Sequence, residues 1–260
     1  MRLALFAVLS LPLLACAQSS LPITGNMTIA SDYRFRGISQ TYLGPTVQGG
    51  IDYSHPSGVY LGNWNSSVSS LVYTGGSGIE MDFYGGYRRT FGDLGVDVGT
   101  VYYHFPKAKQ AGDDFHNWEV YAGATLKWFT LKVFYALSDY FGLNSNQAAN
   151  YWIGRTSGAP LDTNGRGGSK GTYYSELNAV IPLGNDLSLA GHYGRLDVRH
   201  YKELDYEDWK IGFNYDLAGW LLGAFYVDSL ANNEWWYTTG SGGPKDTGKG
   251  GFVFTVGKTF

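Results

Sequence analysis

Hydrophobic and polar residues alternate with a period of two along most of the chain. In residues 209–217 every odd position is large and apolar or aromatic, and every even position is polar or glycine. The same alternation runs through residues 79–88, 118–128 and 129–137. Because successive side chains of a β-strand point to opposite faces, this pattern predicts strands with one apolar face and one polar or small-residue face.

Twelve segments carry this pattern, and we predict a strand in each. They are residues 23–36, 45–54, 58–67, 78–88, 95–105, 115–126, 128–138, 172–182, 186–196, 206–216, 219–229 and 250–260. Short joins fall near 55–58, 90–94, 127, 184–185 and 217–219. Longer joins, rich in Gly, Ser, Asn and Asp, fall at 37–44, 68–77, 106–114, 139–171, 197–205 and 230–249. Short and long joins therefore alternate along the chain.

This alternation of joins predicts an all-β fold, a transmembrane up-and-down antiparallel β-barrel of about twelve strands. Such barrels have short periplasmic turns at one end, long external loops at the other and an even number of strands. With the first long join external, both termini are expected in the periplasm. A soluble β-sandwich is the alternative fold. The barrel is favoured because the polar face of the predicted strands holds Lys, Glu, Asp and Asn, which the apolar interior of a sandwich would not accommodate.

The composition narrows the class of protein further. Only 16% of the 260 residues are charged, 17% are aromatic, 37 are glycine and one is cysteine, and the net charge is −3. These values exclude a disulfide scaffold, a collagen and a charged disordered chain. They also disfavour a basic nucleic-acid-binding protein, so no nucleic-acid partner is expected. The mean hydropathy of −0.18 agrees with strands in which the apolar residues of one face offset the polar residues of the other face.

The first seventeen residues have the order of a secretory signal peptide. Arg2 supplies the positive region, residues 3–14 are apolar, and Ala15-Cys16-Ala17 forms a small-x-small cleavage site. We therefore expect a signal peptide over 1–17, a barrel over 18–260 and a location in the bacterial outer membrane. The alternative is a lipobox, in which Cys16 would be lipidated and become the first mature residue. No later stretch is apolar enough for a transmembrane helix.

Aromatic residues suggest membrane contacts and a partner in assembly. Trp64, Trp118, Trp128, Trp209 and Trp220 lie near predicted strand ends, where interfacial aromatic girdles form. The chain ends with an alternating strand that closes on Phe260, which resembles the recognition strand of outer-membrane barrels, although Lys258 departs from that pattern. The expected partners are therefore outer-membrane lipids, the barrel-assembly machinery and small polar solutes.

Three sequence segments resemble one known family. They are residues 31–41 (SDYRFRGISQT), 45–53 (PTVQGGIDY) and 58–64 (GVYLGNW), and the Lys258-Thr259-Phe260 ending agrees with them. Together they resemble the TorF family, a proteobacterial group of conserved hypothetical proteins regarded as porins. The resemblance implies an outer-membrane barrel with a channel role. It brings no substrate and no catalytic residue.

The polar face of each strand gives the candidate pore-lining residues. In the first strand the alternation places Ile29, Tyr33 and Phe35 on the outer face and three charged residues inside. The full predicted lining is Asp32, Arg34, Arg36, Gln48, Asp52, Glu80, Asp82, Arg88, Asp97, Glu119, Lys132, Glu176, Asn178, His192, Lys210 and Asn214, with Asn63, Asn65 and Lys127 as further candidates. Charges of both signs would create a transverse field that orients polar solutes. If these charges pair with one another, they plug the barrel instead.

The function predicted from these features is passive diffusion of small polar or charged solutes. The alternative is a non-conducting barrel that serves as a receptor, adhesin or structural protein through its external loops. The longest loop, 139–171, either folds into the mouth as a constriction or stays a mobile external loop. We expect no enzyme activity, cofactor or metal, since His-Glu-x-x-His is missing from the sequence and the two histidines that flank one external loop, His104 and His116, are weak evidence for a metal site. Residues Asp162–Gly165 resemble a calcium loop only faintly and are interpreted as a turn.

Overall fold

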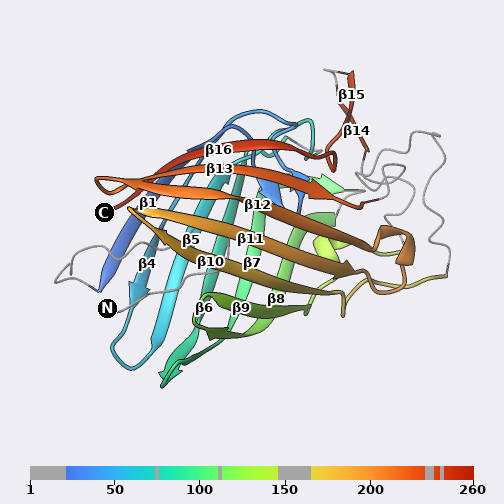
Figure 1. The fold of residues 1–260 in the computed structure, drawn as a ribbon. Coiled ribbons are helices and arrows are strands. Elements are labelled where there is room, and N and C mark those ends of the chain that lie inside the picture. Colours follow the sequence, from blue (N-terminus) through green and yellow to red (C-terminus); the bar gives the residue numbers. More distant parts are fainter. Residues whose placement is uncertain (1–21, 74–75, 111–112, 146–164, 232–236, 241–242) are drawn as a thin grey trace.

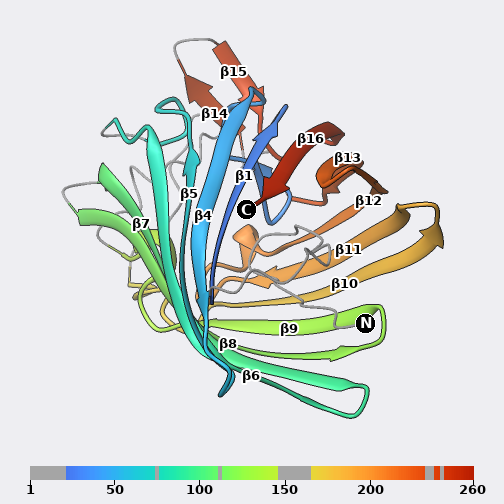
Figure 2. The ribbon, with the colours of Figure 1, turned by 90° about the vertical axis from the view of Figure 1, so that its left-hand side faces the viewer.

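The computed structural model describes residues 22–73, 76–110, 113–145, 165–231, 237–240 and 243–260. Within these residues twelve antiparallel strands close into a barrel, as predicted. Their bounds are β1 Ile23–Ala30, β4 Thr46–Ser54, β5 Val59–Ser67, β6 Ile79–Phe91, β7 Leu94–Gln110, β8 Asp113–Leu126, β9 Phe129–Ala136, β10 Tyr173–Gly184, β11 Leu187–Asp197, β12 Tyr206–Leu217, β13 Trp220–Ser229 and β16 Gly251–Thr259. Each strand pairs with its neighbours in sequence, and β1 closes the ring by pairing with both β4 and β16. Figure 2 shows this ring viewed from one end.

The two ends of the barrel differ in the length of their connections. Five tight turns join β4–β5, β6–β7, β8–β9, β10–β11 and β12–β13 at the end where β1 begins and β16 finishes. The opposite end carries the longer connections, including the small hairpin of β14 (Tyr237–Gly240) and β15 (Gly243–Asp246) (Figure 1). We call these the short-turn end and the long-loop end. The predicted alternation of short and long joins is confirmed except between β7 and β8. There the long join predicted at 106–114 is wrong, because β7 continues to Gln110 and β8 begins at Asp113.

The outer face of the barrel is apolar along its strands. Large hydrophobic side chains are exposed there at alternate positions, among them Ile29, Val47, Ile51, Leu61, Phe83, Val98, Leu131, Val133, Ile211, Phe213, Phe252 and Phe254. In the described part of the chain no helix is long and apolar enough to cross a membrane. The barrel closes without an edge strand, so its backbone groups pair around the whole ring.

The first predicted strand is wrong at its end. It was expected to continue to residue 36, but β1 ends at Ala30 and the chain turns into the barrel. There it forms an inner hairpin of β2 (Arg34–Phe35) and β3 (Ile38–Ser39), which pairs with itself and not with the barrel. The two turn residues, Arg36 and Gly37, have φ of 48° and 80°. Two left-handed residues in a two-residue loop are typical of a type I′ turn, whose twist suits a hairpin.

The inner hairpin belongs to a plug that fills the barrel near its long-loop end. The plug consists of residues 31–43, residues 68–73 and residues 139–143, the last containing the 3-10 turn η1 (Tyr140–Gly142). Its apolar side chains form one buried cluster with inward-facing aromatics of the strands. Edge-to-face rings join the two parts. Tyr33 contacts Trp64, and Phe35 contacts both Tyr103 and Phe141.

Candidate channel lumen

The inward side chains lie on the strand parity that the sequence predicted. Gln48, Glu176, Asn178, His192 and Lys210 line a common cavity, and their outward neighbours are apolar. Asp52, Glu80, Asp82, Arg88, Asp97, Glu119, Lys132 and Asn214 also lie on inward positions of their strands. Three further candidates do not. Lys127 occupies the tight turn between β8 and β9 and is exposed. Asn63 and Asn65 lie on the outward parity of β5, because Trp64 between them faces inward. Whether these residues line a conducting pore stays a prediction.

Asp32, Arg34 and Arg36 reach the interior by a route that differs from the predicted one. They lie on the inner hairpin and the segment leading to it, not on a wall strand. Tyr33 and Phe35 were expected on the outer face, and this is wrong. Both are inside, because residues 31–36 have left the wall and their two faces both meet the interior.

The tryptophans divide between the two faces of the barrel. Trp118, Trp128 and Trp220 are exposed on the outside, as an aromatic girdle requires. Trp209 is half-buried and packs against Tyr226 with the two rings tilted. Trp64 contradicts the girdle prediction, because it faces inward and packs against the plug.

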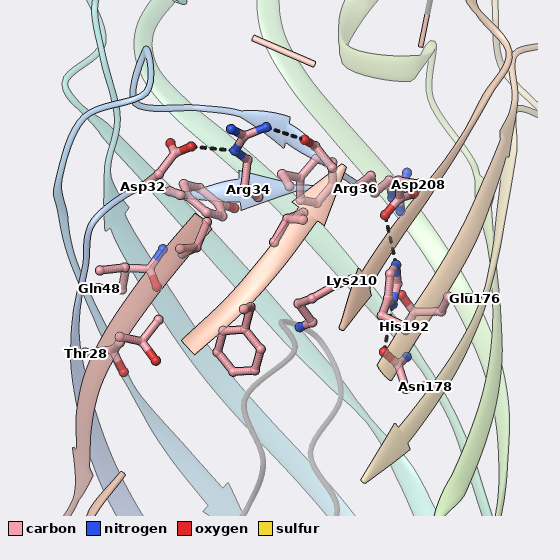
Figure 3. A pocket seen from close by; sticks show the side chains of 18 of the residues that line it. Thr28, Asp32, Arg34, Arg36, Gln48, Glu176, Asn178, His192, Asp208 and Lys210 are labelled. Atoms are coloured by element: carbon pink, nitrogen blue, oxygen red, sulfur yellow. Dashed lines mark hydrogen bonds and ion pairs between the residues drawn. The ribbon is translucent and has the colours of Figure 1, made fainter. Parts of the chain in front are cut away.

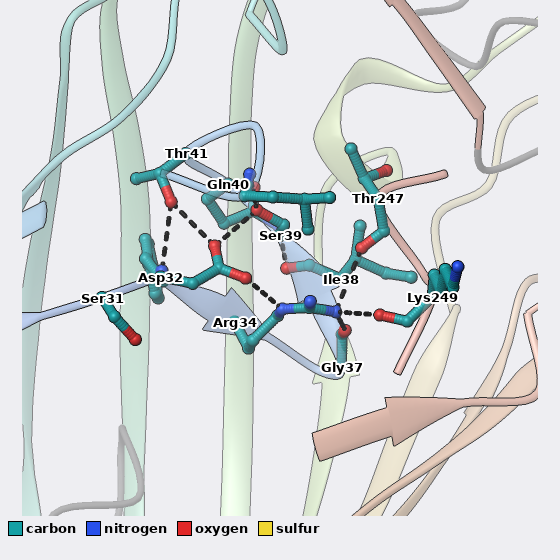
Figure 4. A network of polar contacts seen from close by, with 12 residues as sticks. Ser31, Asp32, Arg34, Gly37, Ile38, Ser39, Gln40, Thr41, Thr247 and Lys249 are labelled. Atoms are coloured by element: carbon teal, nitrogen blue, oxygen red, sulfur yellow. Dashed lines mark hydrogen bonds and ion pairs between the residues drawn. The ribbon is translucent and has the colours of Figure 1, made fainter. Parts of the chain in front are cut away.

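Asp32 and Arg34 hold the base of the inner hairpin (Figure 4). Asp32 Oδ1 accepts hydrogen bonds from the hydroxyls of Ser39, at 2.6 Å, and Thr41, at 2.8 Å. The other carboxylate oxygen pairs with Arg34 Nε. Arg34 Nη1 donates to three backbone carbonyls, those of Gly37, Thr247 and Lys249. The hairpin is thereby tied to the segment that precedes β16.

Arg36 anchors the tip of the hairpin to the opposite wall. Its guanidinium donates two hydrogen bonds to Glu119 on β8, at 3.0 and 2.8 Å, and a third to the Tyr140 hydroxyl at 3.1 Å. Both charged side chains are almost fully buried, with 5% and 2% of their surface exposed. Burial raises the pKa of the Tyr140 phenol to about 12, so this group stays neutral. Asn117 Nδ2 also donates to Glu119, which completes the shell of the carboxylate.

Below the hairpin lies a cavity of about 1050 Å³, a volume that includes space continuous with solvent (Figure 3). One wall, from β10, β11 and β12, carries polar and charged side chains. The facing wall, from β1, β13 and β16, is mainly apolar and includes Ala30, Phe225, Val227 and Val253. The ceiling is the inner hairpin with Arg34 and Arg36.

The polar wall contains a hydrogen-bonded network around His192. Its Nε2 lies 2.9 Å from Asp208 Oδ1 and 3.0 Å from the Tyr174 hydroxyl, and its Nδ1 lies 2.8 Å from Asn178 Oδ1. Tyr174 donates to the second Asp208 oxygen at 2.9 Å. Asp208 was missed as a site residue, although it shares the parity of Lys210 on β12 and could have been found from that spacing. Asn214, further along the same face, is buried, and neither of its side-chain polar atoms has a partner.

Gly194 makes room for this network. It stands on β11 between Glu176 and Asp208 in the sheet register. A Cβ at this position would overlap the Tyr174 hydroxyl and crowd Asp208. A side chain here would therefore displace the phenol that bonds to both His192 and Asp208.

The other half of the wall, from β4 to β9, pairs its charges with tyrosines and with each other. Lys132 Nζ binds Asp97 at 2.9 Å, and Asp97 also accepts from Tyr60 at 2.6 Å. Asp52 accepts from the hydroxyl of Tyr84. These inward tyrosines were not among the predicted lining residues.

Part of the longest loop enters the barrel. Tyr140, Phe141 and Leu143 pack in the buried cluster, and Ser169 ties the returning chain to Leu143 with a 2.6 Å hydrogen bond. Arg166 forms an ion pair with Glu203 on the neighbouring loop. The central residues of the loop, among them Asp162, lie outside the described residues, as does the predicted signal peptide. Among the described residues no group of three or more His, Cys, Asp or Glu is arranged to hold a metal ion.

A closed twelve-stranded barrel with an apolar outside and a charged inside has the architecture of the outer-membrane porins. The sequence matches a bacterial protein family of unknown function, Gcw_chp, over residues 14–260, and the chain belongs to this family. The TorF assignment from residues 31–64 stays a prediction. No curated protein shows significant sequence similarity to the chain.

Solved structures with a similar fold include a porin and another outer membrane protein. A chain from a study of in-meso crystallization of membrane proteins is 8% identical, with 92% of this chain and 83% of that chain covered and a TM-score of 0.50. The KdgM porin, solved with disordered oligogalacturonate, is 8% identical, with 92% and 97% covered and a TM-score of 0.49. The outer membrane protein Omp33 of Acinetobacter baumannii is 9% identical, with 92% and 97% covered and a TM-score of 0.49. At these identities the likeness is one of fold.

Proposed function

We propose that this protein is an outer-membrane channel for passive diffusion of small polar or charged solutes, with the plug as its constriction. The observation that carries the proposal is the division of each strand into an apolar outer face and a charged inner face around a solvent-connected cavity. The outer face suits lipid, and the inner face suits water and polar solutes. The short-turn end lies in the periplasm and the long-loop end outside the cell.

Assembly follows from the same arrangement. The last strand reaches Thr259, and Phe260 continues it with two backbone hydrogen bonds to Gly25. We propose that the barrel-assembly machinery recognises this strand and its terminal aromatic residue. Deletion of Phe260 should lower the amount of folded barrel in the outer membrane, measured by heat-modifiable migration on gels. An unchanged amount would contradict this role.

A second candidate function is a non-conducting barrel that acts through its external loops. The buried cluster favours it, because Tyr33, Ile38 and Phe141 pack tightly at the long-loop end where a solute would enter. A channel with this plug must either leave a narrow path beside it or open by displacing it.

Planar-bilayer recordings of the purified protein separate the two candidates. The matched variant replaces residues 33–41 by a Gly-Ser linker of equal length, which removes the aromatic and charged side chains of the inner hairpin but leaves every barrel strand intact. Discrete currents from the wild type, enlarged in the linker variant, are the expected result. A silent wild type with a conducting variant supports the non-conducting barrel. Silence of both proteins over a range of salt and voltage would overturn the channel proposal.

A further inference from the structure

Two oppositely charged side chains face the cavity without partners of their own. Among the described residues Lys210 on β12 forms no hydrogen bond or ion pair. Its ammonium lies 5.1 Å from the centre of the Phe225 ring, and Glu176 and Asp208 act on it only through their charge. Glu176 on β10 lines the same cavity and, within the part of the chain that the structure describes, accepts no hydrogen bond from another side chain. Among the other inward-facing cations of the described residues, Arg34, Arg36 and Lys132 each bind a carboxylate. Lys210 and Glu176 therefore differ from the paired charges around them.

The sheet register fixes how these two side chains are placed. Asn178, His192 and Lys210 form one cross-strand row, and Glu176, Gly194 and Asp208 form the next row towards the long-loop end. Lys210 and Glu176 therefore lie two strands apart across the sheet, and their rows are separated by two residues along the strands. Strand spacing and rise put their Cα atoms roughly 12 Å apart. Both side chains are long and project into the cavity (Figure 3), so a small molecule can touch both head groups at once.

The charges between these two residues do not compete for a ligand. His192 and Asp208 bind each other, and Tyr174 and Asn178 take up their remaining hydrogen-bonding positions. The hydrogen bonds that hold this pair stay within the wall. The two side chains left for a solute are one ammonium and one carboxylate.

We propose that the cavity binds a small zwitterion, whose carboxylate contacts Lys210 and whose ammonium contacts Glu176. This inference rests on the proposed function and names the class of solute for the channel. A simple anion would be attracted by Lys210 but repelled by Glu176. A simple cation would be attracted by Glu176 but repelled by Lys210. A molecule with both charges satisfies both residues. Its apolar part has the facing wall of Ala30, Val227 and Val253 to pack against.

L-valine, isobutyrate and isobutylamine form a matched set of probes. The second lacks the ammonium of the first, and the third lacks its carboxylate. Titration calorimetry on the detergent-solubilised full barrel at neutral pH and low salt should show saturable binding of L-valine. Each single-charge analogue should bind at least tenfold more weakly. Equal binding of isobutyrate would overturn the proposal in favour of an anion site, and no binding of L-valine would also overturn it.

Variants assign the two contacts to their residues. Lys210→Gln and Glu176→Gln should each weaken L-valine binding about tenfold or more. Glu176→Gln should also leave isobutyrate binding unchanged or stronger, a result that general loss of structure cannot produce. Lys202→Gln, an equal change of charge at an exposed position of the long-loop end, is the control and should bind as the wild type does.

The exchanged pair Lys210→Glu with Glu176→Lys should recover binding, since a zwitterion can bind in the reversed orientation. Failure of the exchange, with both single variants also unaffected, would exclude these residues as the contacts. Calorimetry does not require conduction, so binding without current rejects only the channel. Current without saturable L-valine binding rejects only the zwitterion site.

Discussion

Glu119→Gln should loosen the plug without opening the barrel. The substitution keeps the shape of the side chain but removes the charge that Arg36 binds through two hydrogen bonds. Arg36 then remains buried without a counter-charge, with the amide oxygen of the glutamine, the Tyr140 hydroxyl and the surrounding aromatic rings as its compensation. The ring face of Tyr174, 4.3 Å from the guanidinium carbon, supplies part of that compensation.

The size of the effect follows from the burial of this ion pair. Breaking a buried pair by removing one charge costs about 3–5 kcal/mol, because the other charge is left without its partner. The inner hairpin can escape this cost by leaving the interior, where water solvates Arg36 again. At about 1.4 kcal/mol per factor of ten, the equilibrium between seated and released hairpin should shift by about 10²- to 10³-fold.

A cysteine reporter measures this shift. The only native cysteine is Cys16, so a protein refolded from residue 18 onwards contains none, and Ser39→Cys introduces a single thiol on the buried strand β3. When opening is fast compared with labelling, the rate of thiol modification follows the released fraction. We expect labelling to be about 10²- to 10³-fold faster with Glu119→Gln in the same reporter background. The barrel itself should keep its heat-modifiable migration on gels.

Glu207→Gln is the matched control for this experiment. Glu207 pairs with Arg195, a half-exposed arginine, and exposed ion pairs contribute at most about 1 kcal/mol. The labelling rate of the Glu207→Gln variant should stay within a few-fold of the rate measured for Ser39→Cys alone. If Glu119→Gln changes labelling by less than threefold, the ion pair does not hold the plug and the reasoning is refuted.

Three further predictions test the wall of the barrel. Ile211→Arg should destabilise the barrel in lipid by about 2–4 kcal/mol, since this residue is 51% exposed on the apolar face, whereas its inward neighbour variant Lys210→Glu should fold and shift ion selectivity towards cations. Equal stability of the two variants in urea unfolding from vesicles would contradict the assigned faces. Asp82→Asn should stabilise the barrel by at least 1 kcal/mol in the same assay, because both oxygens of this buried carboxylate lack partners. A loss of stability would mean that Asp82 has a counter-ion. Gly194→Ala should cost about 1–3 kcal/mol by overlap with the Tyr174 hydroxyl, and no change would show that the network can rearrange.

The wall of the barrel could be predicted from the sequence because it depends on strand parity alone. Residues 209–217 show why. A strand places its odd and even side chains on opposite faces, and the apolar outside and polar inside separate them clearly. All twelve strands lie where the alternation placed them, with differences confined to their ends.

The plug could not be predicted in this way, because residues 31–36 also alternate. Asp32, Arg34 and Arg36 look like the inner face of a strand, and Tyr33 and Phe35 look like its outer face. What ends the strand is a local competition for hydrogen bonds. Asp32 accepts from the hydroxyls of Ser39 and Thr41, and the left-handed turn at Arg36 and Gly37 reverses the chain. These contacts form only after the reversal, so alternation carries no sign of them.

Inward aromatics were missed for a different reason. Tyr60 and Tyr121 were left out of the predicted lining, yet both are buried at inward positions of their strands. Val59 and Leu61, the neighbours of Tyr60, are both exposed on the outer face, so parity alone places Tyr60 inside. The phenol hydroxyls bind lumen carboxylates such as Asp97, which lets a tyrosine serve as a polar residue. For barrels of this kind, parity is a better guide than hydropathy to where a tyrosine points.

The way the plug is attached separates its stability from that of the barrel. The inner hairpin has only two backbone pairs of its own, Arg34 with Ser39 and Phe35 with Ile38, and neither strand joins the barrel sheet. Side chains, above all Arg34 and Arg36, and a few loop hydrogen bonds such as Ser39 N to Thr247 O hold it in place. Displacing the hairpin therefore breaks none of the ladder that closes the twelve strands. Substitutions in the hairpin should accordingly change access to the cavity while leaving the stability of the wall intact, and substitutions on the outer face should do the reverse.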